Sequence, residues 1–271
     1  MPTTRINGTE IFWEEVGSGE PIALLNGIMM TTRSWALQTP RLAASHRVIL
    51  HDFRGQLRSL ADTGPFRMEQ HVEDLAALLD HLGIESAHLV GTSYGGEVGM
   101  MFALAHPERV RSLTAIACVS HVDEALRQRV EHWTATARLA PERLYDVTAP
   151  DNFSAGFLAR QPGIIEQGRA RLAEYPPEFF PAFANLCDAF LDLNLTPRLA
   201  EIACPTLVVC GEEDALKPVR YSQTIASGVP GAQLLVVPEA GHAVVLEEAE
   251  TVGTAVLKFL HRSAGEVSET D

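Results

Sequence analysis

The chain has 271 residues, of which 46% are hydrophobic and 21% are charged, so it is long and apolar enough to bury a large core. Its formal net charge is −14, and such a field repels phosphate backbones and anionic membranes, which argues against binding to nucleic acid. No apolar run approaches the roughly 18 residues needed to span a bilayer. The first eight residues also lack the apolar stretch of a secretory signal.

The four cysteines stand at positions 118, 187, 204 and 210 and form no Cys-x-x-Cys pair. Neither a zinc site nor a disulfide scaffold is expected from this spacing in a chain of this length. We therefore expect a cytoplasmic protein without a metal ion.

Short apolar runs alternate with helical stretches along most of the chain, which is typical of a doubly wound α/β domain. Runs that are apolar almost throughout favour strands buried on both faces, hence a mostly parallel sheet. The predicted strands cover residues 5–6, 11–15, 21–25, 47–51, 87–90, 113–117, 206–210 and 233–237. The clearest predicted helices cover residues 68–82, 94–105, 219–226 and 245–261.

Residues 120–197 break this alternation because they show helical segments and no clear strand. We interpret them as a helical cap over one end of the sheet, with the α/β core formed by residues 1–119 and 198–262 and a disordered polar tail at 263–271. Because pockets are built from apolar and aromatic side chains, we expect six such residues to line a substrate pocket. These are Met29, Trp35, Phe153, Phe157, Phe179 and Phe183.

The motif that points to chemistry is Gly-x-Ser-x-Gly around Ser93, between the run ending at Val90 and a small-residue helix. A strand-to-helix turn this tight strains the serine backbone, and only glycine tolerates the close approach on either side. The placement predicts that Ser93 is a nucleophile.

A serine hydroxyl needs a base, and the base needs an acid to orient it. His242 follows the last predicted strand, and Asp214 follows the strand before it, with Glu212 and Glu213 as alternatives. Loops at the carboxyl ends of strands are where α/β sheets place their sites. The order serine, acid, histidine matches one serine-hydrolase fold and differs from the others.

Two backbone N–H groups usually stabilise the oxyanion that forms during acyl transfer. Tyr94, directly after the nucleophile, is one expected donor. The other is expected from the turn at Asn26-Gly27, with Ile28 as donor and Met29 as the alternative. Asn26 either takes part in the chemistry or holds this loop by side-chain hydrogen bonds.

These residues together resemble the α/β-hydrolase superfamily, over about residues 11–260. Further points of resemblance are Asp52-x-Arg54-Gly55, the segment Ala-His-Pro-Glu-Arg-Val at 105–110, and Gly241-His242. The resemblance implies an eight-stranded, mostly parallel sheet flanked by helices, with a helical cap after the sixth strand.

Two departures from the family pattern bear on the substrate. Asn26 stands where the family commonly has His, and the second glycine after Asp52-x-Arg54-Gly55 is missing. Asn26 with Trp35 resembles the 3-oxoadipate enol-lactonases, and the same turn also resembles acyltransferases that use 3-hydroxyacyl carrier proteins.

We therefore expect a serine hydrolase that cleaves a carboxylic ester, lactone or thioester with a largely apolar acyl part, and that uses no cofactor. The alternatives are an acyltransferase with the same three residues and, from another class, a non-catalytic ligand receptor. The expected partner is a small molecule, and the expected assembly is a monomer or a homodimer.

Overall fold

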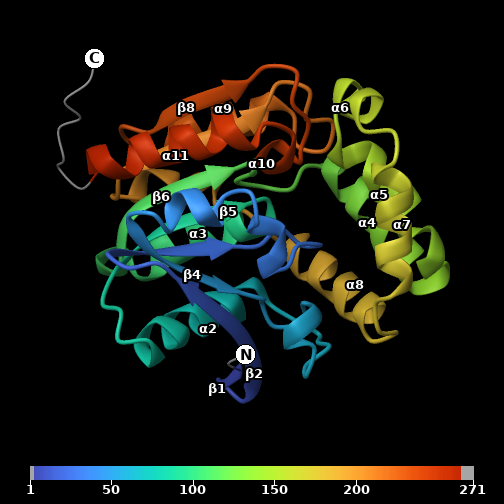
Figure 1. Cartoon of the computed structure of the whole chain (residues 1–271), viewed down its shortest axis with the longest axis horizontal. Helices are drawn as coiled ribbons and strands as arrows, with labels where there is room; N and C mark the ends of the chain where they lie inside the picture. Colours follow the sequence, from blue (N-terminus) through green and yellow to red (C-terminus); the bar gives the residue numbers. More distant parts are fainter. Residues whose placement is uncertain (1–2, 264–271) are drawn as a thin grey trace.

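The computed structural model describes residues 3–263, in which eight strands form one sheet in the order β1-β2-β4-β3-β5-β6-β7-β8 (Figure 1). The pairs β1–β2 and β2–β4 are antiparallel, and every other pair of neighbours is parallel. The strands are β1 (Thr3–Ile6), β2 (Thr9–Val16), β3 (Glu20–Leu25), β4 (His46–His51), β5 (Ala87–Thr92), β6 (Val110–Ile116), β7 (Thr206–Gly211) and β8 (Gln233–Val237).

Helices cover both faces of this sheet. The helices α2 (Met68–His81), α3 (Tyr94–Ala105) and α9 (Val219–Gly228) contribute to the core on one face. The short α1 (Thr39–Leu42), α10 (Val244–Glu247) and the longer α11 (Ala249–Ser263) contribute to the core on the other. Within residues 3–263, no helix is both long and apolar enough to cross a membrane.

The strand β3 shows why the apolar runs are nearly continuous. Ala23 and Leu25 join the core on the α2 and α3 side, whereas Ile22 and Leu24 join the core on the α11 side. All four side chains are fully buried. Strands with two covered faces need apolar residues at every position, and the prediction of a mostly parallel sheet is confirmed.

Between β6 and β7 the chain forms only helices, which lie together beyond one end of the sheet (Figure 1, right). Asp123 caps the first of them by accepting a hydrogen bond from the Leu126 N–H at 2.9 Å. The first and last of these helices pack against each other. The helices are α4 (Glu124–Leu139), α5 (Leu144–Asn152), α6 (Ala155–Arg160), α7 (Ile164–Ala173) and α8 (Phe179–Phe190).

The structure corrects the prediction at the C-terminal end. The helix expected over residues 245–261 is divided at Glu248, so that α10 and α11 are separate. The strand β8 is an edge strand and its first half is exposed, unlike the covered strands beside it. Ser263 belongs to α11 rather than to a tail, and residues 264–271 of the predicted tail lie outside the described residues.

Candidate active site

Ser93 lies between β5 and α3 with φ 51° and ψ −123°, a conformation that non-glycine residues rarely adopt. The neighbouring glycines explain how the chain turns so sharply. A Cβ atom on Gly95 would overlap the carbonyl oxygen of Leu25, and one on Gly96 would overlap the Cys118 sulfur. The strained turn leaves the Ser93 side chain half-buried at the carboxyl end of the sheet.

Three side chains from three separate loops form a hydrogen-bonded chain at this end. His242 Nε2 is 3.0 Å from Ser93 Oγ, and His242 Nδ1 is 2.8 Å from Asp214 Oδ2. The other Asp214 oxygen accepts a hydrogen bond from the Lys217 N–H at 2.7 Å. Asp214 and His242 are 3% and 6% exposed, so bulk water does not compete for these bonds. The structure brings Ser93, Asp214 and His242 together.

The two alternative acids do not reach the histidine. Glu212 and Glu213 are exposed, and their N–H groups donate to the carbonyls of Val237 and Ala240 at 2.9 and 2.8 Å. These two bonds fasten the loop after β7 to the loop after β8. Asp214 therefore faces His242 across two loops that are tied together by their backbones.

The turn after β3 lies beside the serine. Ile28 lines the same cavity as Ser93 and Tyr94, whereas Met29 does not. Within residues 3–263, the N–H groups of Ile28 and Tyr94 make no backbone hydrogen bond outside the regular elements, so both are available to an oxyanion. This placement favours Ile28 over Met29 as the second expected donor.

Asn26 holds this turn in place. Its Nδ2 group lies 3.0 Å from the His51 carbonyl oxygen and 3.1 Å from both Asp52 Oδ1 and Gln56 Oε1. Its Oδ1 atom accepts a hydrogen bond from Trp35 Nε1 at 2.8 Å. Asn26 therefore makes only supporting contacts within the described residues, and the Trp35 indole serves as part of the same brace.

Gln56 directly follows Gly55 and reaches the same turn, whereas Leu57 stands where the family pattern has its second glycine. Its Nε2 group donates to the Gly27 carbonyl at 2.9 Å. The neighbouring Asp52 carboxylate accepts from the Thr32 N–H at 2.8 Å and from Asn26. Burial raises the Asp52 pKa, and these hydrogen bonds oppose that rise. Asn26, Asp52 and Gln56 thus form one buried polar network around this turn.

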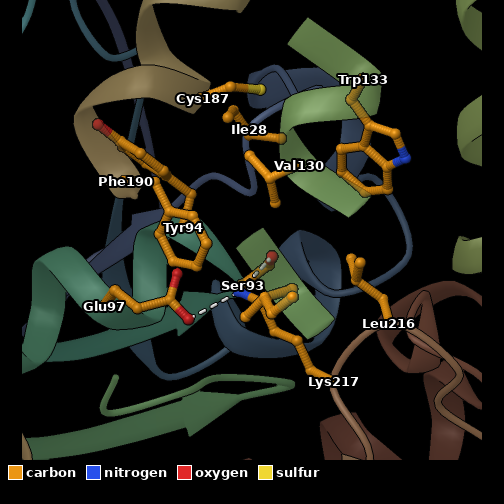
Figure 2. A pocket seen from close by; sticks show the side chains of 11 residues that line it. Ile28, Ser93, Tyr94, Glu97, Val130, Trp133, Cys187, Phe190, Leu216 and Lys217 are labelled. Atoms are coloured by element: carbon orange, nitrogen blue, oxygen red, sulfur yellow. Dashed lines mark hydrogen bonds and ion pairs between the residues drawn. The ribbon is translucent and has the colours of Figure 1, made fainter. Parts of the chain in front are cut away.

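A narrow apolar cavity opens onto Ser93 (Figure 2). The room left for a water-sized molecule is about 20 Å³, which is close to the minimum for one water. We call Ser93, Tyr94, Glu97 and Lys217 the floor of the cavity. We call the side chains from α4 and α8 its wall, namely Leu126, Val130, Trp133, Cys187 and Phe190. Ile28 and Leu216 complete the lining.

None of the six side chains expected to line a pocket lines this one, so that prediction was wrong. Trp35 and Met29 pack against the two cores of the sheet. The others pair with one another, with ring centroids 5.6 Å apart for Phe153–Phe157 and 6.0 Å apart for Phe179–Phe183. These ring pairs help to hold the helical segment together.

The floor also contains a buried ion pair that no sequence motif predicted. Lys217 Nζ is 2.7 Å from Glu97 Oε1 and 3.1 Å from Ser93 Oγ, as Figure 2 shows. The side chains of Lys217 and Glu97 are 4% and 0% exposed. Burial raises the Glu97 pKa, and the Lys217 ammonium opposes that rise.

Composition carried a signal for this pair. The chain has only two lysines among its 21 basic residues, and one of them follows Asp214 by three positions. The chain otherwise uses arginine almost throughout. A lysine beside a candidate site residue therefore indicates a position that uses the compact charge of an ammonium group. Glu97 follows Ser93 by four residues at the start of a predicted helix, which places its carboxylate on the same side of the helix as Ser93.

The helical segment is fastened to the loop that carries His242. Glu247 accepts hydrogen bonds from the Ser154 N–H at 3.0 Å, the Ser154 hydroxyl at 2.7 Å and the Gly241 N–H at 3.0 Å. The Ala243 N–H donates to the Asn152 carbonyl at 2.7 Å. His242 is thereby held between the sheet and the helices that cover it.

Comparisons with known proteins agree with this architecture. A family model described as alpha/beta hydrolase fold matches residues 20–249. A protein of Azorhizobium caulinodans, named as a candidate carbamate hydrolase RutD, is 33% identical over 244 residues, 90% of this chain and 92% of that protein. The 3-oxoadipate enol-lactonase 2 of Acinetobacter baylyi is 29% identical over 241 residues, 88% of this chain and 87% of that protein.

Among solved structures, MGS-M2, an alpha/beta hydrolase enzyme from a Medee basin deep-sea metagenome library, superposes with a TM-score of 0.93. The two chains are 25% identical, and the superposition covers 100% of this chain and 99% of that one.

Proposed function

Since the chain belongs to the α/β-hydrolase family, we propose that it is a serine hydrolase that cleaves a carboxylic ester, lactone or thioester with a largely apolar acyl part. The observation that carries this proposal is the hydrogen-bonded chain from Asp214 through His242 to a strained Ser93 that faces an apolar cavity. The same three residues were predicted from the sequence.

In the proposed mechanism, Ser93 Oγ attacks the substrate carbonyl carbon and its proton passes to His242 Nε2. Asp214 fixes the imidazole tautomer and stabilises its positive charge. The Tyr94 and Ile28 N–H groups stabilise the oxyanion. The bond to the leaving oxygen or sulfur then breaks, and that atom takes the proton from His242.

Water completes the reaction at the acyl-enzyme. It gives one proton to His242 Nε2 and attacks the acyl carbon, the bond to Ser93 Oγ breaks, and Oγ recovers the proton. One ester and one water thus yield one acid and one alcohol.

The substrate class is supported by the wall and by the relatives. Every wall residue is apolar except for the Trp133 N–H and the Cys187 thiol, so the acyl part is expected to be apolar. We propose that the helical segment over residues 120–197 acts as a cap, because two of its helices supply this wall. An enol-lactone and a carbamate both present a carbonyl to a serine, so both belong in a substrate test.

The test is a hydrolysis panel with short to long p-nitrophenyl esters, two lactones, a p-nitrophenyl carbamate and an acyl thioester. Ser93→Ala is expected to lose on the order of 10⁴- to 10⁶-fold in turnover. The matched control is Ser18→Ala, on an exposed loop, which is expected to keep full activity. Ser93→Ala activity within tenfold of wild type would contradict the proposal.

Two further outcomes separate the alternatives. If added thiols or alcohols capture the acyl group faster than water does, the enzyme is an acyltransferase with the same nucleophile. If no substrate turns over and a p-nitrophenyl alkylphosphonate fails to label Ser93, the protein is either a ligand receptor or an enzyme whose cap is closed over Ser93.

A further inference from the structure

We infer that Lys217 is a second hydrogen-bonding partner of the nucleophile, which directs the Ser93 proton onto His242 and stabilises negative charge on Oγ, and that Glu97 holds this lysine in place. The inference deepens the proposed function and rests on Ser93 being the nucleophile.

The hydrogen-bonding groups around Ser93 Oγ fix the direction of its proton. Ser93 Oγ lies between Lys217 Nζ at 3.1 Å and His242 Nε2 at 3.0 Å. An ammonium group has three donors and no acceptor, whereas a hydroxyl can donate once and accept twice. Ser93 must therefore accept from Lys217, and its own proton is left to point at His242. The lysine selects the one hydroxyl orientation from which a base can remove the proton.

The lysine is held by contacts from two directions. Glu97 Oε1 accepts from Nζ at 2.7 Å and from the Val119 N–H at 2.9 Å. The ring of Phe190, on α8, lies with its centroid 4.8 Å from Nζ. The third face of the ammonium group is thus covered by a wall residue, and its position is fixed relative to Ser93.

A contribution to folding stability does not explain the buried ion pair between Lys217 and Glu97. Removing two charges from water commonly costs as much as their attraction returns, and apolar replacements of such pairs are often neutral or stabilising. Glu97 Oε2 is also buried without a hydrogen-bond partner among the described residues, which adds to the cost. An ion pair that is weakly stabilising and touches the nucleophile is better explained by its effect on Oγ.

The charge of Lys217 depends on the groups around it. Glu97 comes from α3, His242 and Asp214 from the loops after β8 and β7, and the thiols of Cys118 and Cys187 from β6's end and α8. Burial raises the pKa of both thiols, which keeps them neutral. Glu97 is therefore the anion that directly pairs with the ammonium group.

Three variants test the inference on the whole protein. Lys217→Met removes the ammonium group and is expected to lower kcat/KM about 10- to 100-fold at every pH, the effect of one lost hydrogen bond to a charged group. Glu97→Gln leaves a buried lysine without its counterion, so it loses its proton more easily. A neutral amine can accept from Ser93, so the basic limb of the Glu97→Gln profile is expected to move to lower pH.

The control is Lys258→Met, because Lys258 is the only other lysine and is exposed on α11. It is expected to leave kcat/KM and its pH profile unchanged. The double variant Lys217→Met with Glu97→Gln removes both charges and is expected to fold while remaining as slow as Lys217→Met. Wild-type activity in the double variant would show that the pair is only structural and would overturn the inference.

A second measurement does not depend on activity. With lysine labelled at ¹³Cε, the protein gives two signals, and Lys258→Met assigns them. Phosphonylation of Ser93 is expected to shift the Lys217 signal and to leave the Lys258 signal in place. An unshifted Lys217 signal on a labelled Ser93 would overturn the inference, whereas a Ser93 that resists labelling would overturn the proposed function instead.

Discussion

The floor and the wall of the cavity are built in different ways. The floor consists of side chains from the turn after β5, the first turn of α3 and the loop before α9, and Lys217 joins Ser93 and Glu97 in it at 3.1 and 2.7 Å. The wall consists of largely apolar side chains on two helices, α4 and α8, that are far apart in the sequence and pack against each other. In the proposed function, the polar floor carries the chemistry and the apolar wall selects the acyl group.

The largest effect is expected from Asp214, which lies behind the floor and orients His242. Asp214→Asn keeps the shape of the side chain and removes the charge that selects the His242 tautomer, so turnover should fall about 10⁴-fold. Glu213→Gln, on the same loop but exposed, should change turnover by less than twofold. Comparable losses in both variants would show that the loop, rather than the Asp214 contact, matters.

The tight turn beneath the floor should tolerate no added atom. In Gly96→Ala the new Cβ overlaps the Cys118 sulfur, so the free energy of unfolding should fall by about 1–3 kcal/mol. Urea unfolding measures this loss, and Cys118→Ala in the same chain should recover part of it. A loss unaffected by Cys118→Ala would place the strain elsewhere in the turn.

A substitution in the wall should instead change which substrate is preferred. Val130→Ala enlarges the cavity, so kcat/KM should shift about tenfold in favour of bulkier acyl groups across the p-nitrophenyl ester series. Phe157→Ala removes a buried ring that does not line the cavity, so it should lower stability without changing this preference. Equal shifts in both variants would remove the distinction between wall and supporting core.

The same contrast explains what could be predicted from the sequence. The sheet and Ser93, Asp214 and His242 follow short local patterns, because a strand end, a glycine turn and a loop are specified by neighbouring residues. The residues of the wall depend on how α4 packs on α8, which no local pattern specifies. Six aromatic or apolar side chains were therefore misplaced, and Lys217 was missed because its partner lies 120 positions away.

A pH-dependent effect on stability concerns two buried histidines, His51 and His71, whose rings both lie against Phe53. Burial lowers the pKa of His51 to about 4 and of His71 to about 3, and within residues 3–263 their ring nitrogens have no hydrogen-bond partner. Both stay neutral in the folded state, so the unfolded chain binds more protons below about pH 6.5. Stability should therefore fall between pH 6.5 and 4, by about 1.4 kcal/mol per pH unit for each histidine.

Urea unfolding at pH 7, 6 and 5 measures this dependence. His71→Leu should remove one histidine's share of the slope, and the exposed His132→Ala should leave the slope unchanged. A slope that survives His71→Leu intact would assign the acid sensitivity to other groups.

The central claim is that Ser93 carries the acyl group during turnover. Intact-mass measurement after rapid quenching with p-nitrophenyl butyrate tests it most directly, followed by peptide mapping of the adduct. The account predicts an added butyryl mass on the peptide that contains Ser93, and no adduct in Ser93→Ala. Turnover without any adduct on Ser93, or an adduct that persists in Ser93→Ala, would contradict it.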